Sequence, residues 1–120
     1  TLRNSSAASD VYKRQYKLHA DAIQDFDYAI SQRPNNITAL YYRSLSYHQL
    51  GRLHNALDDL NQVLNYDPSL IPALFIRADV LKSLNKIEDA INDYEKILSE
   101  ERNNARAKKE LIKIKRAKRL

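Results

Sequence analysis

Apolar residues recur at intervals of three and four positions along most of the chain. In residues 38–50 and again in residues 53–66, this spacing places the apolar side chains on one face of a helix. Gly51 separates the two runs, and Asp67-Pro68-Ser69 ends the second. Glycine tolerates the left-handed conformation that often follows a helix, and proline does not continue one. The pattern therefore predicts two helices joined by a short turn.

This helix pair is repeated along the chain with a period of 34 residues. Pro34 and Pro68 are 34 residues apart, and Asn85 takes the Gly51 position of the next copy. The same spacing relates Ala22, Ala56 and Ala90; Ile23, Leu57 and Ile91; Asp25, Asp59 and Asp93; and Phe26, Leu60 and Tyr94. We expect a partial copy over residues 16–36 and full copies over 37–70 and 71–104. Asn35 or Asn36 is predicted to cap one helix and Ser69 the next, with Pro72 in the first turn.

The repeated positions match a known helical repeat. The tetratricopeptide repeat has the pattern W-x2-L-G-x2-Y…A-x3-F…P. The second copy matches it with Leu40, Tyr47, Ala56, Leu60 and Pro68, and the third with Leu74, Leu81, Ala90 and Tyr94. Residues 17–104 thus resemble this family, although Arg43-Ser44 and Arg77-Ala78 replace the Leu-Gly pair. The resemblance implies an all-α solenoid of antiparallel helix pairs, in which Ala56 and Ala90 let two helices cross closely.

The resemblance also implies a concave groove, lined by the first helix of each pair, that holds a peptide or a partner helix. The matching positions are Thr38, Tyr41, Tyr42, Leu45, His48 and Gln49 in one copy, and Pro72, Phe75, Ile76, Asp79, Lys82 and Ser83 in the next. For Tyr41, Tyr42 and Phe75, lining the groove and packing between helices are equally open interpretations. Arg43, His48 and Arg77 are expected near this groove.

Co-chaperones of this family bind the acidic C-terminus of heat-shock chaperones through a clamp of Lys, Asn and Arg side chains. Here the clamp positions hold Tyr42, Pro72 and Ile76, which supply no donors for a carboxylate. The remaining clamp pair falls in residues 1–15, which lack the apolar positions of a first helix and resemble translated linker sequence. A divergent first helix or a flexible leader are the alternatives, and we assign no function to this segment. The resemblance therefore implies a co-chaperone-like module without the clamp.

Charge is concentrated at one end of the chain. The net charge is +5, and residues 105–120 alone contribute +7 from eight basic residues and Glu110. Residues 16–104 carry −4, so the repeats are acidic. Ala107, Leu111, Ile114 and Ala117 form an apolar stripe, which predicts a terminal helix that caps the array. The alternative is that this helix also binds RNA, an acidic protein or an anionic membrane through Lys108, Lys109, Lys113, Lys115, Arg116, Lys118 and Arg119.

Composition removes most catalytic chemistry. The chain has no cysteine and a single glycine, so thiolate sites and glycine-rich phosphate loops are excluded. The histidines His19, His48 and His54 have no metal-ligand spacing, and Asp58-Asp59 and Glu100-Glu101 are interpreted as solvated charge. We expect a non-enzymatic scaffold or adaptor with no cofactor or metal, a protein or peptide partner, and nucleic acid as a less favoured one. The absence of cysteine and of a visible signal sequence favours a cytoplasmic location.

Overall fold

The computed structural model describes residues 2–119, with side chains from residue 9 onward. These residues form six helices connected by short turns, without any strand in that range. The helices are α1 (Leu2–Gln32), α2 (Ile37–Gln49), α3 (Leu53–Tyr66), α4 (Ile71–Ser83), α5 (Ile87–Glu100) and α6 (Ala105–Arg119). Helices α2 and α3 form one pair, and α4 and α5 form the next, as the repeat predicts.

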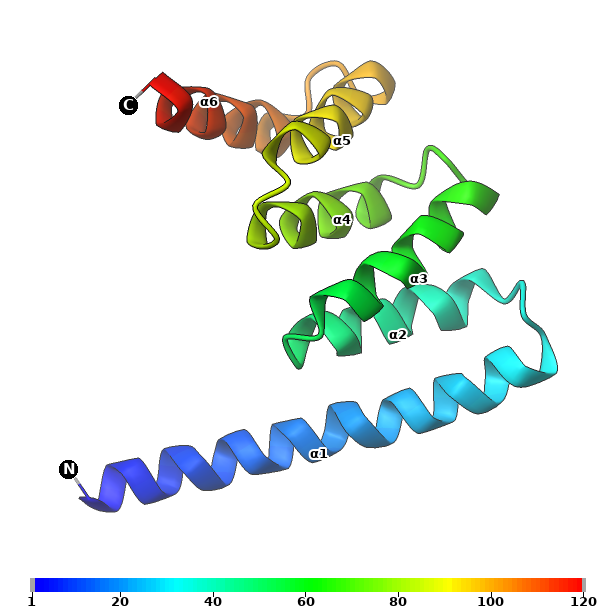
Figure 1. Cartoon of the computed structure of the whole chain (residues 1–120), viewed down its shortest axis with the longest axis vertical. Helices are drawn as coiled ribbons and strands as arrows, with labels where there is room; N and C mark the ends of the chain where they lie inside the picture. Colours follow the sequence, from blue (N-terminus) through cyan, green and yellow to red (C-terminus); the bar gives the residue numbers. More distant parts are fainter. Residues whose placement is uncertain (1, 120) are drawn as a thin grey trace.

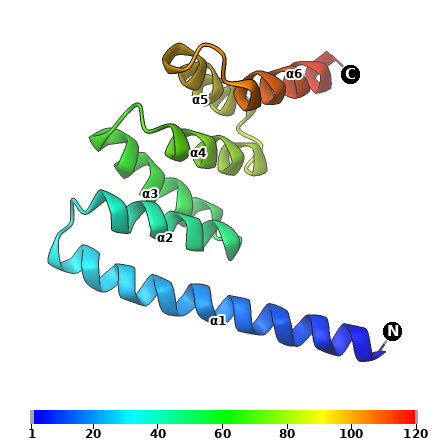
Figure 2. The same ribbon diagram turned by 180° about the vertical axis from the view of Figure 1, so that it is seen from behind.

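The helices are stacked in chain order, with α1 at one end and α6 at the other (Figures 1 and 2). Each helix packs against the next one along the chain, and α2 also contacts α4. The first helices of the two full pairs therefore lie beside each other, as they must in a solenoid of stacked pairs. The all-α solenoid is confirmed.

The turns within the two full pairs have the same geometry. Gly51 has φ 74° and Asn85 has φ 61°, so both are in the left-handed region that the sequence predicts for this position. After each of them the chain closes back on the preceding helix: Arg52 N–H donates to the Tyr47 carbonyl at 2.9 Å and Lys86 N–H to the Leu81 carbonyl at 2.8 Å. These bonds satisfy carbonyls that a helix end would otherwise leave unpaired.

The starts of α2 and α4 differ from each other. Asn36 caps α2, because its side-chain oxygen accepts from Ala39 N–H at 3.0 Å. Pro72 lies in the first turn of α4, as predicted. The predicted cap at Ser69 is wrong: Leu70 directly precedes α4 and caps it without a side-chain bond. Ser69 is one residue too early to reach the helix, and its hydroxyl instead donates to Glu100 at 3.1 Å.

One apolar core runs through the stack from α2 to α6. Ala56 and Ala90 are fully buried in it, beside larger side chains that are also excluded from solvent, among them Leu40, Leu60, Leu74 and Tyr94. The small residues repeat at the same position of α3 and α5, where two helices approach closely. Their burial agrees with the structural role that the 34-residue pattern assigns to them.

Helix α1 departs from the repeat. The partial first copy was expected as a second helix preceded by a separate leader, whereas α1 continues without interruption from Leu2 to Gln32. Side chains 11–18 are exposed, and Ile23 is the first fully buried one along the described part of α1. The side chains of residues 1–8, which include part of the predicted leader, lie outside the described residues. The boundary at residue 15 stays a prediction.

Helix α6 closes the other end of the stack. It packs against α5 and buries Ala107, Leu111 and Ile114, three of the four residues of the predicted stripe, whereas Ala117 is exposed. Asn104 caps it by accepting from Ala107 N–H at 2.9 Å. The predicted capping helix is confirmed. None of the described helices is both long and apolar enough to cross a membrane.

Candidate functional site

The predicted groove residues of α2 line one side of that helix with graded exposure. Thr38, Tyr42 and Gln49 are exposed, whereas Tyr41, Leu45 and His48 are half-buried. Their spacing at about 100° per residue places all six within roughly one third of the helix circumference. This side of α2 thus offers aromatic, apolar and amide groups together.

Three aromatic rings meet at the middle of this surface. The Tyr42 ring stacks on Phe26 of α1 at 6.2 Å between centroids, and Tyr41 meets it edge-on at 5.4 Å. Burial, followed by the neighbouring Tyr42, raises the pKa of Tyr41 above its ordinary value. Tyr42 is nevertheless 49% exposed. Tyr41 therefore packs partly into the core, whereas Tyr42 is held by two rings and still presents its outer face to solvent.

The predicted groove residues of α4 are placed differently, because α6 lies over them. Phe75 is only 7% exposed. Its ring lies 6.2 Å from that of Tyr94, and the Arg106 guanidinium of α6 lies over it at 4.3 Å. Of the two interpretations open for Phe75, this burial is the one expected for packing between helices. Ile76 is half-buried and packs against the same core.

Asp79 and Lys82 form a polar network that attaches α6 to α4. Asp79 accepts the Tyr94 hydroxyl at 3.2 Å and pairs with Arg106 at 3.6 Å. Lys82 donates to Glu110 at 2.9 Å. This hydrogen bond lowers the pKa of Glu110, and burial, followed by the nearby Asp79, raises the pKa of Tyr94 to about 12. These predicted groove residues therefore hold the terminal helix in place.

A repeated ion pair lies on the other side of α2 and α4. The Arg43 guanidinium donates twice to Asp59 of α3, at 2.8 and 2.7 Å, and once to Asp27 of α1 at 2.8 Å. Asp59 is 2% exposed, so its interpretation as solvated charge is wrong. The guanidinium compensates its carboxylate, which makes burial of that charge tolerable. The hydrogen bonds to Asp59 raise the pKa of Arg43 despite burial.

The next repeat forms the same arrangement. Arg77 donates twice to Asp93 of α5, at 2.9 and 2.7 Å, and once to Asn61 of α3 at 3.1 Å. Each arginine therefore links three consecutive helices. Both arginines are committed to these partners and do not point to the predicted groove, which corrects their expected position. The signal was present in the sequence, where an Arg column and an Asp column both repeat every 34 residues.

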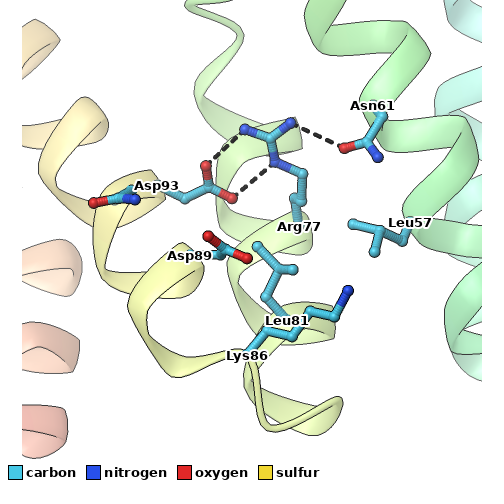
Figure 3. Close-up of a pocket in the computed structure, with 8 residues that line it drawn as sticks. Leu57, Asn61, Arg77, Leu81, Lys86, Asp89 and Asp93 are labelled. Carbon is cyan, nitrogen blue, oxygen red and sulfur yellow. Dashed lines mark hydrogen bonds and ion pairs between the residues drawn. The ribbon is translucent and has the colours of Figure 1, made fainter.

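Two cavities open between α3 and α5 on either side of Arg77. The first has a volume of about 330 Å³ and is shown in Figure 3, with Leu57 and Asn61 on α3 and Leu81 below Arg77 on α4. The second, of about 500 Å³, shares Arg77 and Asp93 with the first and extends to Pro68 and Lys96. Sequence analysis placed no site on this side of the stack.

The basic residues of α6 fall into two groups. Arg106, Lys113 and Lys118 pair with Asp79, Glu110 and Glu88, respectively. The others make no ion pair within the described part of the chain and lie on one exposed side of the helix around Ile112, which is 52% exposed. We call this side the basic stripe; it consists of Lys108, Lys109, Lys115, Arg116 and Arg119.

The stacked pairs, the buried alanines and the terminal helix define the class of protein as an α-solenoid of helical repeats. The family follows from the comparisons: the tetratricopeptide repeat models match residues 38–69 and 71–104. No curated protein sequence matches the chain. The chain belongs to the tetratricopeptide repeat family, a generally non-catalytic fold for protein interactions.

Solved structures of the same family are similar over nearly the whole chain. The first tetratricopeptide repeat domain of human RPAP3 is 30% identical, with a TM-score of 0.75, and the match covers 92% of this chain and 87% of that one. The first such domain of Spaghetti (RPAP3), bound to the HSP90 peptide SRMEEVD, is 27% identical, with a TM-score of 0.77 and coverage of 96% and 92%. The second domain of human RPAP3, in complex with the HSP70 peptide SGPTIEEVD, is 25% identical, with a TM-score of 0.74 and coverage of 92% and 91%.

Proposed function

We propose that this chain is a non-catalytic adaptor that binds a peptide or a partner helix along the exposed side of α2. The observation that carries the proposal is Tyr42, which is 49% exposed although two other rings fix its orientation. A ring held in this way loses little conformational freedom when a partner binds, and its hydroxyl is available for a hydrogen bond. The similar domains with bound peptides support a peptide as the partner.

The proposed recognition does not depend on a terminal carboxylate. The clamp positions Tyr42, Pro72 and Ile76 supply no cationic donor. Arg43 and Arg77 cannot substitute for one, because Asp59 and Asp93 occupy their guanidinium groups. We therefore expect contacts to the partner's side chains and backbone to supply the affinity, and amidation of a bound peptide's C-terminus to leave it unchanged.

Replacing Tyr42 with alanine should weaken peptide binding about tenfold or more, because a central aromatic side chain commonly contributes over ~1.4 kcal/mol to an interface. The probe is a peptide selected from a random library on the intact chain, and the measurement is calorimetric titration beside circular dichroism. Tyr66→Ala is the matched control, since Tyr66 is 55% exposed at the end of α3. Equal affinity of the Tyr42→Ala and wild-type chains would refute the assignment.

A second candidate function is favoured by the basic stripe on α6. Its five cations share one side of the helix and have no ion-pair partner within residues 9–119, so they are available to an anionic ligand. The apolar side of α6 is buried on α5, which opposes insertion into a membrane. The stripe has no aromatic side chain for base stacking. We propose an acidic segment of a partner protein as its ligand.

Binding of poly-glutamate to the intact chain should weaken steeply between 50 and 200 mM salt, as it does when several cations release counterions, with roughly a tenfold loss or more. Lys108→Glu with Lys115→Glu should abolish it, because both side chains lie in the stripe. Lys96→Glu on α5 is the control. A salt-independent affinity, or tighter binding of poly-uridine than of poly-glutamate, would reject an acidic protein as the ligand.

A further inference from the structure

The two full repeats differ at one position next to their arginines. In α2, Tyr47 follows Arg43 by four residues, and its ring lies 5.6 Å from the Arg43 guanidinium. In α4, Leu81 follows Arg77 by the same four residues. Leucine has no ring to extend along the guanidinium. The first cavity, of about 330 Å³, lies at this point, with Arg77 and Leu81 in its wall (Figure 3).

The two arginines also differ in how far their charge is compensated. Arg43 bonds two carboxylates, Asp59 and Asp27. Arg77 bonds one carboxylate, Asp93, and the neutral amide of Asn61. The positive charge of Arg77 is therefore compensated by fewer acidic partners in direct contact, although Asp89 and Lys86 also line the cavity. A less compensated guanidinium attracts the face of an aromatic ring more strongly.

The cavity has the shape and polarity that a tyrosine side chain requires. Leu57 and Leu81 form an apolar wall, and Arg77 lies above them, as Figure 3 shows. Lys86 and Asp89 are exposed at the margin, where the cavity meets solvent and where a phenolic hydroxyl can find a hydrogen-bond partner. Its volume is at the lower end of the range of ligand pockets, about 300–1,000 Å³.

We propose that this cavity binds a tyrosine side chain of a partner protein, which takes the place against Arg77 that Tyr47 takes against Arg43. This surface is separate from the proposed peptide surface. Arg77 and Leu81 lie about half a turn around α4 from Phe75 and Asp79, at 100° per residue. The proposal therefore stands or falls independently of binding along α2, and it gives the stack a second contact surface between α3 and α5.

The test uses p-cresol, the tyrosine side chain without its backbone, and records ¹⁵N NMR signals of the intact chain, including the Arg77 Nε–H. We expect a saturable shift of this signal. The matched probe 4-methylcyclohexanol has a similar size and no aromatic face, and it should bind about fivefold more weakly, the ratio that a partly exposed cation–π contact supplies.

Two reciprocal substitutions localise the site. Leu81→Tyr, or Leu81→Phe if the first variant is not folded, should remove the p-cresol effect at Arg77 because the new ring occupies the cavity. Tyr47→Leu should create a second set of shifts at the Arg43 Nε–H. The proposal is overturned if the wild-type Arg77 signal shows no saturable shift, if the shift persists in the folded Leu81 variant, or if both probes bind equally.

Discussion

Replacing Ala90 with tryptophan is expected to abolish the cooperative unfolding of the stack. Ala90 has no exposed surface and lies in the continuous core, at the position of α5 that repeats Ala56 of α3. Overpacking a core by a few methylene groups costs ~1–3 kcal/mol, and an indole is much larger than that. Because small domains have total stabilities of about 5 kcal/mol at the lower end, we expect loss of the native state at 25 °C.

Urea denaturation followed by circular dichroism measures this effect. Glu95→Trp is the matched control, since Glu95 lies on the same helix with its side chain exposed. That variant should keep the wild-type midpoint within the small range typical of surface substitutions, roughly 0.5 kcal/mol. A folded Ala90→Trp chain with the wild-type midpoint would contradict the close crossing of helices at this alanine.

Replacing Asp93 with alanine is expected to destabilise the stack by about 3 kcal/mol, because it leaves Arg77 without its bidentate partner in a mostly buried position. The Asp93 side chain is 6% exposed and that of Arg77 is 24% exposed. Arg77 connects α3, α4 and α5. The loss should therefore appear as lower stability of the whole stack in a urea titration, rather than as fraying of one helix.

The double replacement Arg77→Leu with Asp93→Leu separates the pair's net contribution from the cost of an unpaired charge. We expect it to be more stable than Asp93→Ala, since neither charge then remains buried. Asp89→Ala, on the exposed side of α5, is the control and should have a near wild-type midpoint. Equal midpoints for Asp93→Ala and Asp89→Ala would show that the repeated Arg–Asp pair contributes nothing to the fold.

The sequence predicted the repeat and its turns because both depend on local chemistry. The 34-residue period, Gly51 and Asn85 at the turns, the cap at Asn36 and the stripe of Ala107, Leu111 and Ile114 all follow from helix geometry. Each of these features involves residues close together in the chain. The structure agrees with each of them.

The features that sequence reasoning missed depend on contacts between helices. Asp59 is adjacent to Asp58, and the pair has the composition of a solvated surface; only the neighbouring helix brings Arg43 to one of them. Phase along a single helix likewise places Phe75 with the groove residues, whereas the position of α6 puts Arg106 over its ring. The cavity at Leu81 required a comparison of two aligned repeats in space.

The central claim is that the partner lies along the exposed side of α2, and site-specific photo-crosslinking tests it most directly. The photoreactive residue p-benzoylphenylalanine is introduced at Tyr42 in one chain and at Tyr66 in another, and each is irradiated with the selected peptide. The account predicts a crosslinked product from position 42 and none from position 66. Crosslinking at position 66 alone, or equally at both positions, would contradict it.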